Sequence, residues 1–274
     1  MNRRGLLAVL AAGVTAGLTA CSEPGAQSRA LPSRALPSPQ QSVTEVATPS
    51  TTTGVAAPPF TAPVAITKVP VPFGTLYRLP GTTDHVALTI DDGTDEAVLA
   101  AYARLARDTG LRLTFFCNGI NPSWTEHADL LRPLVDDNQV FIANHTWSHP
   151  NLTTLSQHRI AEEVQRNERF LRHTYGISGR PFLRPPFGFH NPRVDAQLAA
   201  LGYPAVTLWW GSLGDATVET PAAIIANATA WLLPGRIVIG HANHPPVMKV
   251  YGQLVEIIRS RRLQPVHLGD VFEV

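Results

Sequence analysis

The chain has 274 residues, 44% of them apolar, and a formal net charge of +1. This length and composition suit one substantial folded domain with appendages, or two small domains. Residues 83–274 contain 16 of the 22 Lys and Arg but 19 of the 21 Asp and Glu, which gives a net charge of 16 − 19 = −3. This balance excludes nucleic-acid binding through bulk charge.

The N-terminus is typical of an export signal. Arg3 and Arg4 precede an apolar stretch over residues 5–20, which is shorter than the roughly 20 apolar residues of a membrane-spanning helix. The "LTAC" that follows resembles the lipobox of bacterial lipoproteins, in which the cysteine, here Cys21, becomes the lipid-bearing first residue. We therefore expect residues 1–20 to be an export signal and Cys21 to be a lipid anchor on the outer side of the cytoplasmic membrane. An incidental cysteine in an uncleaved anchor is the alternative, and the arginine pair leaves the export route, Sec or twin-arginine, open.

The next segment, residues 21–82, is rich in Pro, Ser, Thr and Ala and lacks sustained apolar periodicity. "RALPS" occurs at Arg29 and again at Arg34, which we interpret as low complexity and not as a folded repeat. This composition predicts a flexible linker. Its last third, "VAITKVPVPFGTLYRLPG", is more apolar and could pack as an edge onto the domain that follows.

Strand and helix patterns alternate from residue 83 to the C-terminus. Short apolar runs predict strands at residues 86–90, 113–117, 139–143, 181–183, 205–208, 237–239 and 266–268. Helical periodicity predicts helices at residues 95–108, 128–136, 157–175, 192–201, 220–233 and 247–261. The alternation predicts one α/β domain over residues 83–274, with a parallel sheet that is either open or closed into a barrel. In both architectures ligands bind at the carboxyl ends of the strands.

Polar residues suited to catalysis follow most of these predicted strands. They are Asp91 and Asp92 after the first strand, His145 and His149 after the third, Arg184 after the fourth, Asp215 after the fifth and His241 after the sixth. Taken singly, such residues have ordinary explanations: a capped turn, a polar loop, a surface arginine or a hydrogen-bonded core histidine. Together at the strand ends they predict one site.

The residue types in this set suit a metal centre. His145 and His149 are four residues apart, so their imidazoles can share one ion through bonds of about 2.0–2.1 Å. Asp91 or Asp92 supplies the anionic third ligand, and a divalent cation lets both neighbouring carboxylates stay ionised, one as a ligand and one free to accept a proton. Two imidazoles and one carboxylate leave coordination positions open, which favours hydrolysis or a related reaction.

These residues lie in motifs that resemble the NodB-homology polysaccharide deacetylases, carbohydrate esterase family 4. The resemblance covers residue 84 to the C-terminus and rests on "TIDDG", "HTWSH" and "RPPFG", with weaker matches at "WWGSLGD" and "IVIGH". It implies a distorted (β/α) barrel with fewer than eight strands, about seven and parallel, and metal-dependent removal of acetyl groups from sugars.

The resemblance also implies individual roles. Asp91 would be the general base, held by hydrogen bonds from Arg184, and the metal would be held by Asp92, His145 and His149. Zinc suits this ligand set, and cobalt, nickel or manganese would be accepted.

On the other side of the substrate, the resemblance makes His241 the general acid, with Asp215 keeping it protonated and oriented. The backbone amide near Phe187 would stabilise the oxyanion. The family often has Trp after the carboxylate that Asp215 represents, where this chain has Ala216, and His244 could compete for the role of acid.

Aromatic side chains beside these motifs could stack on sugar rings, although most of them are expected in the core. They are Trp147, Phe187, Phe189, Trp209 and Trp210.

The sequence therefore predicts a lipid-tethered, metal-dependent N-deacetylase that acts on N-acetylglucosamine or N-acetylmuramic acid of peptidoglycan. We expect a monomer that contacts the membrane only through its lipid. The alternatives are an O-acetyl esterase or a chitooligosaccharide deacetylase acting on another glycan and, outside the enzymes, a non-catalytic wall-binding module.

Overall fold

The computed structural model describes residues 58–64 and 66–274, so the expected export signal, Cys21 and most of the expected linker lie outside the described residues. Within the described part, no helix has the length and apolar content that a membrane span requires.

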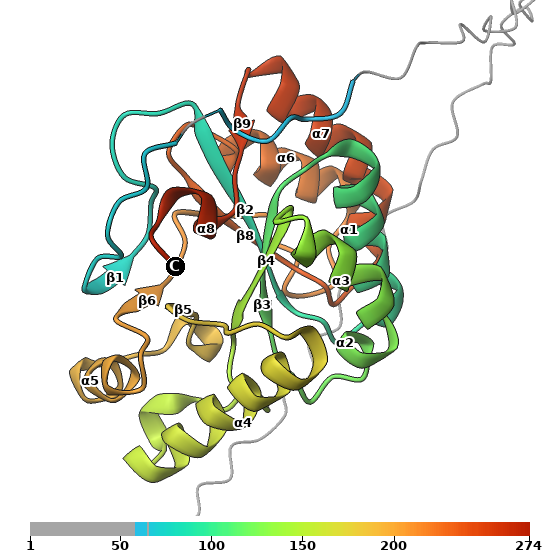
Figure 1. Cartoon of the computed structure of the whole chain (residues 1–274). Coiled ribbons are helices and arrows are strands. Elements are labelled where there is room, and N and C mark those ends of the chain that lie inside the picture. The colour runs from blue at the N-terminus through green and yellow to red at the C-terminus, as the bar shows by residue number, and fades with distance from the viewer. Residues whose placement is uncertain (1–57, 65) are drawn as a thin grey trace, which may run out of the picture. The chain divides into compact units, whose positions relative to one another are not determined.

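The described strands form one curled parallel sheet with helices around its outside (Figure 1). The strand order is β1-β6-β5-β4-β3-β2-β8-β7, with β9 paired to β2. The bounds are β1 Gly74–Leu76, β2 His85–Asp92, β3 Leu113–Cys117, β4 Val140–Asn144, β5 Phe182–Leu183, β6 Ala205–Thr207, β7 Gly211–Ser212, β8 Ile237–His241 and β9 Gln264–Pro265. This architecture confirms the predicted distorted (β/α) barrel, in which strand ends meet at one edge. The sheet of the described residues has nine strands and not about seven, because it also includes the short strands β1 and β7.

The helices begin and end at residues suited to those positions. Their bounds are α1 Glu96–Thr109, α2 Ser123–Glu126, α3 Ala128–Asp136, α4 Gln157–Tyr175, α5 Pro192–Ala200, α6 Pro221–Trp231, α7 Tyr251–Ser260 and α8 Leu268–Val271. The Asp95 side chain accepts a hydrogen bond from the backbone N–H of Val98 and so caps α1, while Ser156 caps α4 in the same way. Both helices end at a glycine in the left-handed conformation, Gly110 and Gly176.

Strand β2 is buried on both faces, as expected for a parallel strand covered by helices on one side. Val86, Leu88 and Ile90 pack in the core cluster that includes residues of α1. Ala87 packs in a different cluster, with Phe116 and other residues inside the curl of the sheet. Because every second side chain of a strand faces the same side of the sheet, Asp91 lies on the same face as Ala87, inside the curl.

Two local predictions differ from the structure, and two strands were missed. The strand expected at 266–268 was wrong, because the strand is Gln264–Pro265 and Leu268 begins helix α8. The Asp270 side chain accepts a hydrogen bond from the backbone N–H of His267, and this cap favours a helix there. The last long helix begins at Tyr251 and not at 247, because Pro245–Val250 form a 3₁₀ helix. Strands β1 and β7 were not predicted.

Parts of residues 58–64 and 66–82, which were expected in the linker, contact the domain in the structure. The backbone N–H of Phe60 donates to the carbonyl of Thr109 at 2.7 Å. Strand β1 pairs with β6, and Leu76 and Leu79 are buried in the core cluster inside the curl. The packed part of the described chain therefore extends well before residue 83.

Candidate active site

A cavity of about 710 Å³ lies at the carboxyl ends of the central strands. The predicted site residues that line it are Asp91, Asp92, His145, His149, Phe187, Trp209 and His241. Arg184 and Asp215 are buried, and each hydrogen-bonds to one of these lining residues. The structure thus brings together residues that are up to 150 positions apart in the sequence.

The backbone at the end of β2 turns both aspartates toward this cavity. In a regular strand Asp92 would face the opposite side from Asp91, but its φ is 70°, in the left-handed region. The Trp124 indole N–H donates to the Asp92 carbonyl at 2.8 Å and supports this turn. Gly93 follows with φ 81°, and a Cβ there would lie 2.6 Å from the same indole nitrogen, so only glycine fits.

Left-handed backbone conformations gather at the site. Among the described residues, six that are not glycine have positive φ, and four of these are Asp92, Thr146, His149 and Phe187. Such conformations cost of order 1–3 kcal/mol each and persist where the surrounding structure enforces them, as at active sites and ligand clamps.

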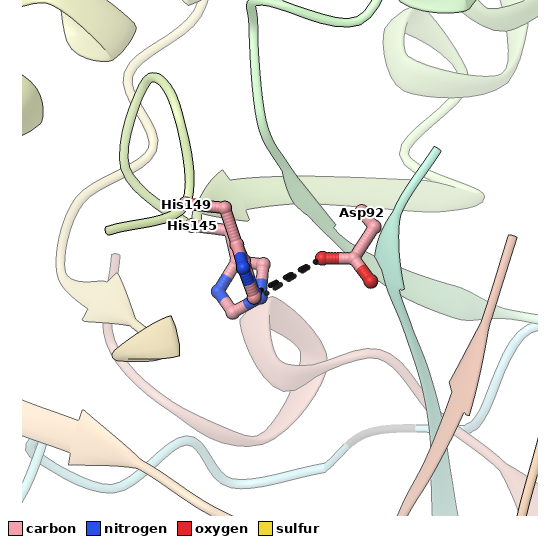
Figure 2. Close-up of side chains that lie close together, drawn as sticks. All are labelled: Asp92, His145 and His149. Atoms are coloured by element: carbon pink, nitrogen blue, oxygen red, sulfur yellow. Dashed lines mark ion pairs between the residues drawn. The ribbon is translucent and has the colours of Figure 1, made fainter. Parts of the chain in front are cut away.

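Asp92, His145 and His149 form a cluster suited to a divalent metal ion (Figure 2). Asp92 Oδ1 lies 3.3 Å from His145 Nε2 and 3.4 Å from His149 Nε2. The Nδ1–H of His145 donates to the carbonyl of Arg184 at 2.6 Å, which leaves Nε2 as the nitrogen that can bind a metal. Asp92 Oδ1 is buried and has no hydrogen-bond partner among the described residues, so the donor set fits a bound cation.

The electrostatics of the cluster agree with this fit. Burial raises the pKa of Asp92, but the neighbouring His145, His149 and Asn243 outweigh it, and the pKa lies below its ordinary value. Burial and repulsion from His145 lower the pKa of His149 to about 4, so its imidazole is neutral at pH 7. Burial lowers the pKa of His145, but Asp91 and Asp92 outweigh it and the net shift is upward. A metal would therefore compete with a proton for His145.

Arg184 holds Asp91 from inside the sheet. Its Nη1 donates to Asp91 Oδ1 at 2.5 Å, while its Nε and Nη2 donate to the carbonyls of Thr207 and Leu208 at 3.2 and 3.1 Å. The guanidinium is fully buried and lies 4.1 Å from the centre of the Phe116 ring. With Oδ1 occupied, the other oxygen of Asp91, Oδ2, faces the metal cluster at 3.5 Å from His145 Nε2.

His241 lies beside Asp91, because the two residues are paired in register on β8 and β2. Its Nδ1–H donates to Asp215 Oδ1 at 3.0 Å, and its backbone N–H donates to Asp215 Oδ2 at 3.1 Å. Burial lowers the pKa of His241, but Asp215 and the two aspartates of β2 outweigh it and raise the pKa above its ordinary value. The free Nε2 of a charged imidazole suits a general acid.

The predicted aromatic residues divide between the cavity and its surroundings. Trp209 lines the cavity, as does Phe187, which is 58% exposed and packs edge-on against the His149 ring. Trp147 does not line it: this ring packs against Phe170 and lies 4.2 Å below the Arg166 guanidinium.

Ala216, which follows β7, and His244, which follows β8, lie differently with respect to the cavity. Ala216 lines the cavity, where the family often has the larger Trp. His244 is not a lining residue, and its Nε2 contacts the Ala216 carbonyl at 3.3 Å.

Sequence reasoning missed three asparagines of the cavity wall, Asn118, Asn121 and Asn243. Asn118 directly follows β3, so the rule of polar residues at strand ends could have found it. Its Nδ2 donates to the carbonyls of His145 and Thr146, and its buried Oδ1 has no hydrogen-bond partner among the described residues. Asn243 lies two residues after His241 in the sequence, but no sequence signal indicates what its side chain contacts.

Comparisons with known proteins agree with this geometry. Residues 78–206 match the family model for polysaccharide deacetylases. A chitin deacetylase of Pestalotiopsis sp is 27% identical over 76% of this chain and 70% of its own length. A peptidoglycan-N-acetylglucosamine deacetylase of Bacillus cereus is 29% identical over 60% of this chain, and the match covers less than two thirds, 58%, of that relative.

Solved structures show the same fold. A peptidoglycan N-acetylglucosamine deacetylase superposes with a TM-score of 0.66 and 20% identity, over 73% of this chain and 93% of that one. The matched family region contains Asp91, the metal cluster and Arg184, and the structure adds Asp215 and His241 from beyond it. Residues 78–206 therefore match the polysaccharide deacetylase family, and the fold resembles that of a solved deacetylase.

Proposed function

We propose that this chain is a metal-dependent hydrolase that removes acetyl groups from N-acetylated cell-wall polysaccharide. One observation carries the proposal: in the same cavity Asp91 lies beside the metal cluster, and His241, which hydrogen-bonds to Asp215, lies next to Asp91 on the neighbouring strand. A base and an acid in one cavity are what hydrolysis of an amide requires, and a simple binding module has no use for them.

Asp92, His145 and His149 would hold the metal, and their ligand types suit zinc, with cobalt, nickel or manganese as substitutes. When bound, such a cation supplies a Lewis acid for the acetyl carbonyl and for water.

The chain's own residues carry the proton transfers. Asp91 Oδ2 would take a proton from the attacking water, while the hydrogen bond from Arg184 orients the carboxylate. The backbone N–H of Phe187 would donate to the oxyanion as the carbon becomes tetrahedral. The C–N bond then breaks, and His241 Nε2 gives its proton to the departing nitrogen. Water is thus added across the bond, and the products are acetate and the free amine.

The surroundings of the cavity support a sugar polymer as the substrate. Phe187 lines the cavity and Phe189 lies beside it, with ring centres 5.8 Å apart. Both side chains are more than half exposed, which suits stacking on pyranose faces.

We further propose peptidoglycan as the polysaccharide and the outer side of the cytoplasmic membrane as the location. The support is the lipobox-like sequence at Cys21 and the long linker after it, which would give the domain reach into the wall. Relatives named for chitin and for peptidoglycan are both similar to this chain, so the assay must include both polymers.

The test is acetate release from purified peptidoglycan, from chitooligosaccharides and from matched O-acetylated sugars. Each is measured with the full chain as purified, after chelation, and after metals are added back. We expect release from the N-acetylated polymers that chelation abolishes and zinc restores. Faster release from the esters would favour the O-acetyl esterase, and peptidoglycan binding without acetate release from any substrate would favour the wall-binding module.

A further inference from the structure

We propose that Asn243 is a positioning residue that selects which oxygen of Asp92 binds the metal. The inference rests on the metal site of the proposed function. Asn243 Nδ2 donates to Asp92 Oδ2 at 2.6 Å. The other oxygen of the same carboxylate, Oδ1, is the buried atom without a hydrogen-bond partner that faces the two imidazoles.

The orientation of the Asn243 amide is itself fixed. Its Oδ1 accepts hydrogen bonds from the Thr94 hydroxyl at 2.8 Å and from the Thr94 backbone N–H at 3.4 Å. Since Thr94 N–H can only donate, the amide oxygen must face Thr94 and the NH₂ group must face Asp92. The amide therefore occupies one carboxylate oxygen and leaves the other free for the cation.

The backbone around Asn243 ties the metal ligand to the general acid. Ala242 N–H donates to the carbonyl of Asp91, and the carbonyl of Ala242 accepts from Asp95 N–H, both at 3.0 Å. This segment directly follows His241 at the end of β8. Asn243 thus links the strand that carries the acid to the carboxylate that would hold the metal, and it acts through Asp92 and not on the substrate.

Partners that orient a metal ligand typically change metal affinity by 10- to 100-fold when they are removed. We therefore expect Asn243→Ala to weaken zinc binding by roughly 10-fold or more. The measurement is a titration of the metal-free full chain with zinc against a chromophoric chelator, with cobalt absorption spectra as a second readout of ligand geometry. His244→Ala is the matched control, because it is the next residue in the loop and does not line the cavity.

Thr94→Val gives a second, independent variant that leaves the carboxylate and its amide in place. It removes the hydroxyl that holds the Asn243 amide, so we expect a smaller loss of zinc affinity than for Asn243→Ala. In the double variant, Thr94→Val should add no further loss, because the hydroxyl acts only through Asn243.

Zinc affinity of Asn243→Ala within twofold of the wild type, with an unchanged cobalt spectrum, would overturn the inference. So would equal losses from Asn243→Ala and His244→Ala, since these would indicate a general disturbance of the loop. The readout is independent of the reaction: a wild-type chain that binds zinc but releases no acetate would refute the proposed function and leave this test intact.

Discussion

Asp91 is the residue whose role separates an enzyme from a metal-binding wall protein. Asp91→Asn keeps an oxygen for the Arg184 hydrogen bond but cannot accept a proton from water at neutral pH. Since general base catalysis typically contributes 10²- to 10⁴-fold, we expect acetate release to fall by at least about 100-fold. Zinc content should stay at the wild-type level, because Asp92 and the two imidazoles are unchanged. Activity above a tenth of the wild type would contradict the assignment of the base.

The pair formed by His241 and Asp215 predicts a pH dependence. The acid must be protonated to act, and the carboxylate stabilises the charged imidazole, which contributes to the raised pKa of His241. Activity is therefore present below this raised pKa and is lost as the pH rises through it. Asp215→Asn removes the negative partner, lowers the pKa of His241, and should move the alkaline limb of kcat/KM to lower pH. A profile with an unmoved alkaline limb would assign the acid to another group.

At the scale of single residues, the sequence predicted the residue types of the site and their places at strand ends. It predicted little about the direction in which each side chain points. Asp91, His145 and His241 could be predicted because each ends or follows an apolar run that forms a central strand. Trp147 lies in the loop that carries His145 and His149, yet the loop turns its ring toward α4, which contains Arg166 and Phe170. Such directions depend on loop backbone angles, and the positive φ of Thr146 next to Trp147 has no signature in the sequence.

At the scale of elements, the packing of strand β1 against β6 leads us to expect that the segment before residue 83 contributes to the free energy of unfolding. Leu76 ends this strand and is 6% exposed in the core cluster inside the sheet, whereas Val64 is 92% exposed. We expect Leu76→Ala to reduce the free energy of unfolding by roughly 2–5 kcal/mol, because it removes buried methyl groups and leaves a cavity. Val64→Ala is the matched control and should stay within about 0.5 kcal/mol of the wild type in urea-induced unfolding. Equal effects of the two substitutions would show that β1 does not pack in solution.

The elements that could be predicted are those long enough to show a pattern. Strands β2, β3, β4 and β8 have five residues or more, and each was located to within two residues of its bounds. Strands β1, β5, β6, β7 and β9 have two or three residues, too few for a periodicity to emerge. Their positions are set by pairing with neighbours, such as Gly74 with Ala205, and of these only β5 and β6 were predicted.

At the scale of the molecule, the proposed metal site predicts that zinc binding stabilises the fold. A metal that binds the folded chain and not the unfolded chain stabilises it by about 2.7 kcal/mol at a concentration 100 times Kd. We expect zinc to raise the melting temperature of the chelated full chain in calorimetry. Asp92→Asn should abolish most of this rise, while His244→Ala should keep it. A melting temperature that zinc does not change would argue against a metal centre.

The overall architecture could be predicted only in part from alternating patterns. Strand and helix order indicated a parallel sheet but left open whether it closes, and the family resemblance supplied the distorted barrel. The structure shows one contact that spans the interior: the guanidinium of Arg184, after β5, reaches the end of β6 and the end of β2. Strands β2 and β5 are separated in the sheet by β3 and β4, so this contact depends on the curl and is invisible to any local pattern.

The left-handed backbone of Asp92 has a consequence for protein engineering and for motif searches. Copying the letters Asp-Asp-Gly onto the tip of an ordinary extended strand would send the second acid into the hydrophobic layer under the helices. A functional transfer of this motif to another protein must also include an indole placed like that of Trp124, and a glycine at the position of Gly93 that leaves space for it. The turn at Asp92 therefore depends on the distant Trp124 ring that supports it. A match to the tripeptide alone, without such a ring, says little about metal binding.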